Sequence, residues 1–540
     1  MGSIKNIFRC FLCLTATALI FSACTKNFQT INETQGAPTT ATIGSTMNSV
    51  FSSLFLQWQE QASIHNDYYY EATQLGAETS VSGYVLANGV NDVWKDYYSQ
   101  LQNMRKIQDQ INAAADQESM KNIQSILYIL RAYKTFRVTD QFGDIPYFNA
   151  GKAYTENSDN FRVAYDPQQS IYDSLLNDLT WAVKNINTSS NPVSSLGDAY
   201  ASLGNFDVFF NGNMTKWLKF ANSLRLRYAM QMVEKDPATA TPIILDAITG
   251  SAPLIDSGND VGMWPASLAN YDLSGRWWSF SSGGTGFVRM SSTMWNLVSD
   301  NNTDAGIFDP RAHLFVETNQ AGQWAPFTIG VSTGDAINAY YSGSDPTQKN
   351  NCLYSPFNWY LVRDEWYIPE LILTDAEVHF LKAEAYARGL GVGQNLTTAQ
   401  TEYQAGITSS VNFWYNIAAN TNNASEDWAS VAPAMPTQTQ MNTLFANPKV
   451  AFTGTADDAV AKIYAQEWLS YFRQPWLAFN LWRRTGNTPV DPASQPSSTL
   501  ASFYRLPYAQ DEAVNNADNY NAEISKIGGN NTNIKVWWMK

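Results

Sequence analysis

Apolar residues recur three or four positions apart in several parts of this chain, which predicts amphipathic helices. The segments with this spacing are 126–138, 172–186, 217–232, 378–386 and 463–482. Two helix starts carry capping chemistry: Asp166 is followed by Pro167 at the first helical position, and Thr374 with Glu377 has the spacing of a capping box. We therefore expect a mostly helical fold.

One predicted helix pair has the signature of a tetratricopeptide unit. The small and aromatic positions of such a unit are occupied if the turn between its two helices is lengthened by about four residues. The residues at these positions are Ala383, Tyr386, Ala399, Tyr403 and Gly406. The longer turn is Gly389–Gly393. No strand precedes its glycines and no basic residue follows them, so a helix connector fits better than a phosphate-binding loop.

The middle of the chain, 249–365, has a different texture. It is rich in Gly, Ser, Asn and Trp and has short β-favouring runs at His313–Val316 and Trp359–Val362. We expect a loop-rich region with a few short strands, lying on the helical scaffold. Loops of this length in a compact protein are usually functional.

The first 23 residues have the pattern of a secretion signal, with Lys5, Arg9 and a short apolar run. Two cleavage sites compete, a small-x-small site at Ala16–Ala18 and a lipoprotein site before Cys24. The first would cut the apolar run short, so we favour lipidation of Cys24. Residues 24–45 lack apolar periodicity and predict a flexible tether, and 46–540 then form a single domain.

The cysteines agree with this interpretation. Of the four in the chain, Cys10 and Cys13 leave with the signal. Only Cys24 and Cys352 remain, which is no disulfide framework for an exported protein. We expect Cys24 to be the anchor and Cys352 a partly buried thiol without chemistry.

Charge and composition exclude some functions. The chain has 540 residues, 14% of them aromatic, and a formal net charge of −14. An acidic surface repels phosphate backbones, so nucleic acid is not an expected partner.

A hydrolytic centre has little support in the sequence. The three histidines, His65, His313 and His379, form no zinc-binding HExxH pattern, and no GxSxG elbow occurs. The adjacent acids Asp364–Glu365 and Asp511–Glu512 point apart along the chain. A glycosidase can bring acids together from distant segments, so this class stays open as an alternative.

We expect no metal and no cofactor. Asp300–Gly306 alternates oxygen-bearing side chains before a glycine, as calcium loops do. The twelfth position is Arg311 rather than Glu, so a turn rich in Asn and Asp is the better interpretation.

Aromatic residues of the loop-rich region are the most informative chemistry. They are Trp264, Tyr271, Trp277, Trp278, Phe280, Trp324, Tyr340 and Tyr341. Sugar rings lie flat on such side chains while polar groups take the hydroxyls, and roughly half of these rings should instead fill the interior. Trp277 and Trp278 stand among glycines and are expected to be exposed, with Arg276 and Asp272 as polar neighbours. Such a platform needs no catalyst.

Further segments carry a family resemblance over nearly the whole chain. They are Asp140–Tyr147, Tyr165–Tyr172, Phe209–Asn213, Lys216–Arg227, Asp309–Arg311, Glu377–Gly389, Tyr403–Ser410, Gln466–Trp468, Arg483–Gly486 and Val536–Trp538. In this order they resemble the SusD/RagB-like nutrient-binding outer-membrane lipoproteins, in the starch-binding branch that associates with the outer membrane. Gln474–Trp476 departs from the family's pattern, and its proline is expected to bend or cap that helix.

The resemblance implies tetratricopeptide-like helix pairs, a lipid anchor in the outer membrane facing the cell exterior, and no catalysis. It also implies a partner, a TonB-dependent barrel of the SusC/RagA type. The ligand would be a glycan, or alternatively a peptide. In such proteins the region before the first long helix can line the ligand site, which adds Tyr84 and Trp94 to the candidates.

Overall fold

The structure, a computed structural model, describes most of the chain. The described residues are 42–79, 85–155, 157–189, 207, 209–264, 288–334, 352–358, 360, 369–420, 428, 431–452 and 454–540. Residues Ile43–Lys540 form one compact unit. Cys24 and the predicted signal and tether up to residue 41 lie outside the described residues, so these boundaries stay predictions.

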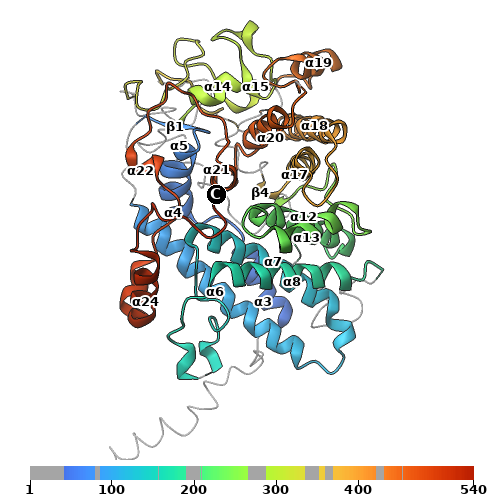
Figure 1. Cartoon of the computed structure of the whole chain (residues 1–540), viewed down its shortest axis with the longest axis vertical. Coiled ribbons are helices and arrows are strands. Elements are labelled where there is room, and N and C mark those ends of the chain that lie inside the picture. Colours follow the sequence, from blue (N-terminus) through green and yellow to red (C-terminus); the bar gives the residue numbers. More distant parts are fainter. Residues whose placement is uncertain are drawn as a thin grey trace, which may run out of the picture. The chain divides into compact units, whose positions relative to one another are not determined.

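Helices make up most of the described chain (Figure 1). The α-helices are α3 (Ile43–Ser52), α4 (Trp58–Glu60), α5 (Tyr70–Ala72), α6 (Leu86–Asn112), α7 (Gln117–Phe142), α8 (Gln168–Asn185), α12 (Met214–Met232), α13 (Pro237–Thr249), α14 (Ser292–Val298), α15 (Ala312–Phe315), α17 (Asp375–Arg388), α18 (Leu396–Asn420), α19 (Gln438–Ala446), α20 (Ala456–Ser470), α21 (Pro475–Thr485), α22 (Ser498–Ala501), α23 (Gln510–Asn515) and α24 (Ala517–Ile527). A π-helix, η1 (Gln61–Tyr69), joins α4 to α5, and the 3₁₀ turns are η2 (Ala153–Thr155), η3 (Ser158–Asn160) and η6 (Asp304–Gly306). The predicted mostly helical class is confirmed.

The segment 463–482 was predicted as one apolar run, but the structure divides it. Helix α20 ends at Ser470 and α21 begins at Pro475, with Gln474 as its N-cap. Proline lacks an N–H and has a fixed φ, so it fits the first position of a helix and not its interior. The expected effect of Pro475 is therefore a new start rather than a bend.

The two predicted helix starts have different outcomes. Thr374 caps α17 through a hydrogen bond from the Glu377 N–H at 3.2 Å. Asp166 does not cap α8. The N-cap residue of α8 is Pro167, and the carboxylate that accepts from the Gln168 N–H, at 2.8 Å, belongs to Asp144. The cap comes from a distant segment, which local spacing does not reveal.

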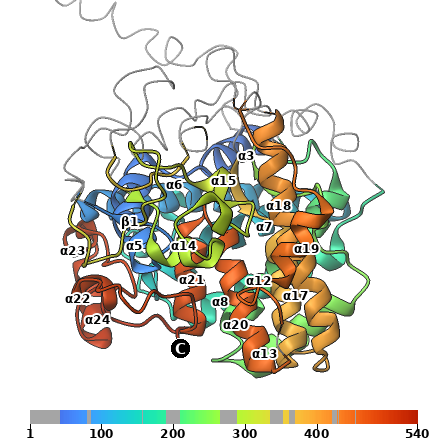
Figure 2. The ribbon, with the colours of Figure 1, turned by 90° about the horizontal axis from the view of Figure 1, so that it is seen from above.

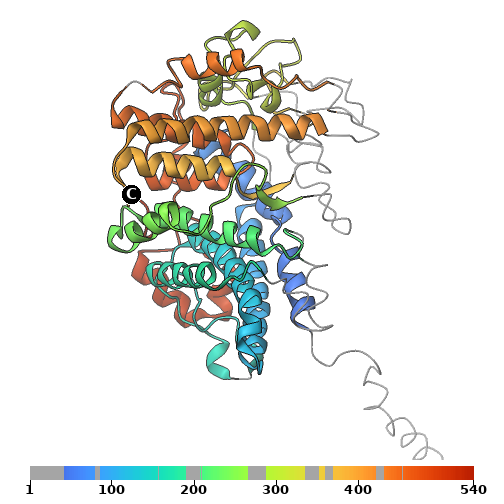
Figure 3. The ribbon, with the colours of Figure 1, turned by 90° about the vertical axis from the view of Figure 1, so that its right-hand side faces the viewer.

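Successive helix pairs stack in layers. Figure 3 shows α7 with α8 in teal, α12 with α13 in green and α17 with α18 in orange, one above another. Helix α12 contacts both α8 and α17, so it is the middle of this stack. Helices α22 and α24 lie on the other side of the scaffold from α18 and α19 (Figure 2). The layers give a helical base on which α14 and α15 lie beyond α18 and α20 (Figure 1).

The α17–α18 pair has the packing expected of the tetratricopeptide positions. Ala383, Ala399 and Tyr403 are buried. A Cβ on Gly406 would lie 2.9 Å from the Phe380 ring, so only glycine allows the helices to approach this closely. Gly389 ends α17 in the left-handed conformation, with a φ of 72°. The expected connector role of this glycine-rich turn is confirmed.

Helix α7 is enclosed by its neighbours. Every residue from Ile129 to Phe142 is buried, including cationic ones. A buried charge is tolerated only when it is paired, and each of these cations meets a carboxylate of another segment. The pairs are Arg131 with Asp178 at 2.7 Å, Lys134 with Asp96 at 2.7 Å and Arg137 with Glu60 at 2.6 Å.

Two short antiparallel ribbons complete the described fold. Strand β1 (Ala77–Glu78) pairs with β3 (Val288–Arg289), and β2 (Val261–Met263) pairs with β4 (Glu370–Leu373). The expectation of a few short strands in the loop-rich region is confirmed. The β-favouring run His313–Val316 is corrected, because its first three residues lie in α15 and only Val316 makes an isolated bridge, to Phe357. No helix in the described ranges is long and apolar enough to cross a membrane.

A buried carboxyl group at the junction of α17, α20 and α21 lacks a close cation. Glu384 accepts from Arg484 at 2.8 Å and from Arg388 at 2.7 Å. Glu467 is 3.8 Å from the same Arg484, and its close contact is a hydrogen bond from the Tyr471 hydroxyl at 2.8 Å. Burial, against the pull of Arg484, raises the pKa of Glu467 to about 8.

Replacing Glu467 with Gln should flatten the dependence of stability on pH. The folded protein holds the Glu467 proton more tightly than an unfolded glutamate, with a pKa of 4.5. Its contribution is therefore complete below that value and is lost as pH rises through about 8. Between pH 5 and 8.5, urea unfolding of the wild type should show a loss of about 2 kcal/mol or more that the variant lacks.

Glu118→Gln is the matched control, since the Glu118 side chain is 81% exposed. It should keep the wild-type pH profile. Parallel profiles for the wild type and Glu467→Gln would show that Glu467 is ionised in the folded protein.

Candidate functional site

Most of the predicted ligand-binding residues fall outside the described residues. They are Tyr84, Tyr271, Asp272, Arg276, Trp277, Trp278 and Phe280. The described candidates are Trp94, Trp264 and Trp324. The structure also describes the residues that flank these segments in the sequence.

The first ribbon brings the ends of two distant segments together. Glu78, at the end of β1, pairs with Val288, at the start of β3. Residues 80–84 follow the first of these and residues 265–287 precede the second. Paired strands lie about 5 Å apart. Tyr84 lies outside the described residues, six positions after Glu78 in the sequence.

The second ribbon contains the strand that precedes the 265–287 segment in the sequence. Met263, at the end of β2, pairs with Glu370, at the start of β4. Residues 265–287 leave one strand and residues 361–368 arrive at the other. Both ends of the tryptophan-rich segment are thus fixed on backbone that is hydrogen-bonded to a neighbouring strand.

Trp264 stands at the exit from β2 and is half-buried. Its ring packs edge-on against Phe413 of α18, with centroids 6.1 Å apart. Phe413 in turn contacts Trp414 at 5.0 Å, and Trp414 contacts Phe315 of α15 at 5.6 Å. A continuous series of rings therefore connects the start of the 265–287 segment to α15.

Trp324 is buried rather than exposed to a ligand. It is 9% exposed, stacks on Trp295 with centroids 5.0 Å apart and donates its indole N–H to Asp304 at 2.7 Å. We expected this ring among the ligand contacts. Its burial corrects that expectation and gives it a supporting role within the loop-rich region. Trp295, which the sequence did not single out, lies on α14, where its apolar spacing resembles that of ordinary core residues.

Trp94 lies in a different part of the scaffold. It is 6% exposed on α6, and its indole N–H donates to Glu512 at 3.3 Å. The other Glu512 oxygen accepts from the Tyr165 hydroxyl at 2.9 Å. Trp94 is therefore a core residue, not a partner of Trp264. The contacts also assign Glu512, one of the adjacent acids considered for hydrolysis, to packing.

Asp300–Gly306 forms a compact turn. The Asn301 side chain accepts from the Thr303 N–H at 3.1 Å, and Asn302 accepts from the Trp295 indole N–H at 2.6 Å. These oxygens are thus engaged in the turn and in holding α14. Among the described residues, no group of three or more His, Cys, Asp or Glu side chains is arranged to hold a metal ion.

Arg311 joins this region to the helical layers. The guanidinium group is fully buried and binds both oxygens of Asp309, at 3.0 and 2.6 Å. It also donates to Ser410 of α18 at 3.1 Å and to Gln466 of α20. The Tyr415 hydroxyl donates to the Pro310 carbonyl at 3.0 Å. The sequence marked Asp309–Arg311 only as a shared motif. Its role as an anchor depends on partners 99 and 155 residues away in the sequence.

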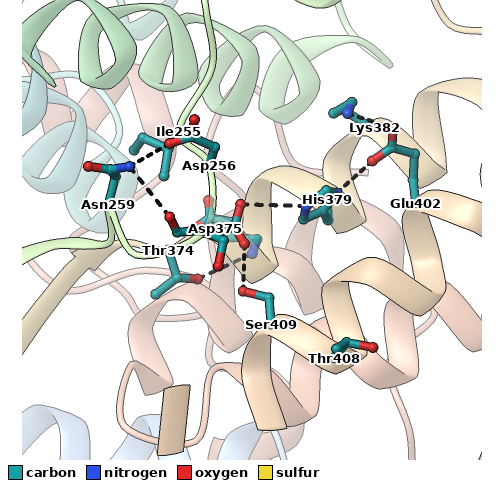
Figure 4. A network of polar contacts seen from close by, with 12 residues as sticks. Ile255, Asp256, Asn259, Thr374, Asp375, His379, Lys382, Glu402, Thr408 and Ser409 are labelled. Carbon is teal, nitrogen blue, oxygen red and sulfur yellow. Dashed lines mark hydrogen bonds and ion pairs between the residues drawn. The ribbon is translucent and has the colours of Figure 1, made fainter. Parts of the chain in front are cut away.

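A network of polar contacts connects the residues before β2 to α17 and α18 (Figure 4). His379 lies between Glu402, 2.6 Å from its Nδ1, and Asp375, 3.5 Å from its Nε2. Asp375 accepts from the Ser409 hydroxyl at 2.7 Å, and its N–H donates to Asp260 at 2.8 Å. Burial raises the pKa of Asp260 to about 6. Since Asp260 directly precedes β2, the network holds that strand against α17 and α18, in agreement with a structural histidine.

Comparison with known proteins gives a consistent fold. A family profile described as SusD-like, starch-binding and associating with the outer membrane matches residues 33–508. The fold is similar to that of a chitin-binding protein with 23% identity and a TM-score of 0.67, which covers 92% of this chain and 100% of that one. It is also similar to a SusD-like protein from Bacteroides thetaiotaomicron VPI-5482, with 18% identity, a TM-score of 0.65 and coverage of 92% and 98%.

A further similar structure is a chitin-binding SusD homolog from Flavobacterium johnsoniae. It has 21% identity and a TM-score of 0.62, with coverage of 92% of this chain and 98% of that one. Among curated proteins, no sequence match was significant. At these identities the structures establish the fold alone.

Replacing Arg311 with Leu should strongly destabilise the protein. The change leaves Asp309 buried without its partner, and breaking a buried pair on one side costs about 3–5 kcal/mol. Chemical unfolding should report this loss. Asp309→Asn with Arg311→Leu removes both charges and should recover part of it. A double variant as unstable as the single one would show that packing, not the unpaired charge, is what Arg311 provides.

Proposed function

The chain belongs to the SusD-like family of starch-binding proteins that associate with the outer membrane, and from that premise we propose that it captures oligosaccharides at the cell surface. Family membership confirms the expected recognition and the expectation of a binding protein rather than an enzyme. The finer statements, on the ligand, the transporter and the anchor, are the proposal.

The observation that supports the proposal is the match to the starch-binding family over residues 33–508. The strand pairing of Glu78 with Val288 adds to it, because the segment that includes Tyr84 follows β1 in the sequence and the segment that includes Trp277–Trp278 precedes β3. Aromatic rings with polar neighbours such as Asp272 and Arg276 are suited to sugars, which offer C–H faces and hydroxyls together. A glycan is thus the ligand that matches this composition.

Delivery completes the proposed role. A surface lipoprotein that holds an oligosaccharide needs a route inward, and a SusC/RagA-type TonB-dependent barrel supplies one. Two of the similar structures are described as chitin-binding. Chitin oligosaccharides therefore stand beside starch-derived ones as the first ligands to test.

Purified protein should bind one of these oligosaccharides and release it unchanged. The panel contains chitin oligosaccharides, malto-oligosaccharides and a mixed peptide, with titration for affinity and chromatography for products. Trp277→Ala/Trp278→Ala should weaken binding about tenfold or more, because an aromatic ring that stacks on a ligand contributes on the order of 1–3 kcal/mol. Melting temperature should change little if the rings are exposed.

Trp58→Ala is the matched control, since Trp58 is 38% exposed and lies on α4. Its affinity should equal that of the wild type. Binding of the peptide alone would favour a peptide-binding relative, and a shortened oligosaccharide would point to a glycosidase. Unchanged affinity in the double variant would remove Trp277 and Trp278 from the site, and a large melting shift would place them in the core.

Replacing Cys24 with Ala should release the protein from membranes, because lipidation at this cysteine would be the attachment. Cell fractionation in a strain that lacks the transporter separates anchoring from capture by a partner. Cys13→Ala, in the predicted signal, should leave the protein membrane-bound. Continued membrane association of Cys24→Ala would refute the proposed anchor.

A further inference from the structure

A pocket of about 340 Å³ is lined by residues of the segments 143–169 and 505–537, outside the loop-rich region. Its walls come from the turn after α7, the start of α8, the Arg505–Tyr508 segment, the end of α24 and the chain near Lys535. None of its lining residues belongs to 249–365. Small-molecule sites begin at about 300 Å³, so the volume suits a ligand the size of one sugar ring.

Arg505 is a side chain of this pocket with an unsatisfied hydrogen-bond donor. It is 2% exposed, its Nε donates to the Leu506 carbonyl at 3.0 Å, and its guanidinium carbon lies 4.2 Å from the centre of the Tyr508 ring. Its Nη2 is buried and has no hydrogen-bond partner among the residues that the structure describes. A buried charged donor without an acceptor is costly, so an acceptor from outside would stabilise it.

The acceptors of the pocket wall are already engaged. Asp144 accepts from the Gln168 N–H at 2.8 Å through one oxygen and from Lys526 through the other. Lys526 also contacts Glu523 at 3.3 Å. Both Asp144 oxygens are therefore bonded to donors other than Arg505.

Donors, by contrast, remain. Lys535 is exposed and gives one hydrogen bond, to an oxygen of the terminal carboxylate of Lys540 at 2.7 Å, which uses one of three ammonium hydrogens. The positive end of α8 also faces the pocket through Gln168 and Gln169. Among the described side chains that line the pocket, Arg505, Lys526 and Lys535 are cationic and Asp144 is the one carboxylate, while Glu523 and the terminal carboxylate of Lys540 lie beside Lys526 and Lys535.

We propose that this pocket binds a small molecule that carries an oxyanion. The anionic group would accept from Arg505 Nη2 and from Lys535. The body of the ligand would lie against Trp537 and Ile534, which are half-buried in the pocket wall. Carboxylates and phosphates share the chemistry that the guanidinium recognises, so a sugar acid and inorganic phosphate are the two sources to separate.

Calorimetric titration of the purified protein with D-glucuronate, inorganic phosphate and D-glucose tests the proposal. Glucuronate should bind and glucose should not. Competition by phosphate would place both anions on the same donors, whereas binding of phosphate alone would make the inorganic ion the ligand. Absence of binding by both anions, or equal binding of glucose and glucuronate, would overturn the proposal.

Variants locate the binding. Arg505→Gln should weaken glucuronate or phosphate binding about tenfold, the usual size of one hydrogen bond to a charged group. Lys535→Gln changes an exposed side chain, so the protein keeps its fold, and should weaken binding about threefold. Lys184→Gln, at the other end of α8, makes the same charge change about 24 Å away and should have no effect.

Oligosaccharide capture should be unchanged in Arg505→Gln and Lys535→Gln, since the two proposed sites share no residue. Unaltered anion affinity in Lys535→Gln together with Arg505→Gln would overturn the proposal. If Arg505→Gln fails to fold, an unaltered affinity in Lys535→Gln, with no weakening of anion binding by added salt, overturns it as well.

Discussion

Three buried ion pairs between α7 and other segments select how the helices around α7 assemble. On α7, Arg131, Lys134 and Arg137 reach partners on three different elements. Each pair is satisfied at only one rotation of the helix and one height along it, because a shift of a single turn would leave charges unpaired in a low-dielectric interior. Hydrophobic contacts favour compact packing of any kind, whereas these pairs select one arrangement.

The same constraint extends to the proposed ligand surface. Arg311 is bound by Asp309 within its own turn and then by α18 and α20, so the position of α15 follows from the helical layers. Trp324 and Trp295 pack beside it. A stacking platform is useful only if its base does not yield, since movement of a ring by about 1 Å already weakens a contact. The described part of the loop-rich region around α15 is thus held to the helical layers by the buried Arg311–Asp309 pair.

Local spacing predicted the helices well and their partners poorly. The segments 126–138 and 378–386 lie inside α7 and α17, because one apolar face is enough to specify a helix. The cap of α8 and the burial of Trp94 were missed for a common reason. Asp144 and Glu512, which supply the acceptors, are distant in sequence. An aromatic residue in a glycine-rich stretch has the same local pattern whether a distant carboxylate buries its N–H or a ligand covers its face.

That distinction bears on the candidates that remain. Trp324 and Trp94 both have an indole N–H bonded to a carboxylate, and both are buried. The acids available near Trp277–Trp278 in sequence are few, with Asp272 the nearest, and adjacent tryptophans direct their side chains differently in any extended backbone. A buried indole N–H can also find a main-chain acceptor, as the Trp468 N–H does in the Thr73 carbonyl at 3.1 Å. The proposed exposure of Trp277 and Trp278 predicts instead that their N–H groups bond to water or to a sugar hydroxyl.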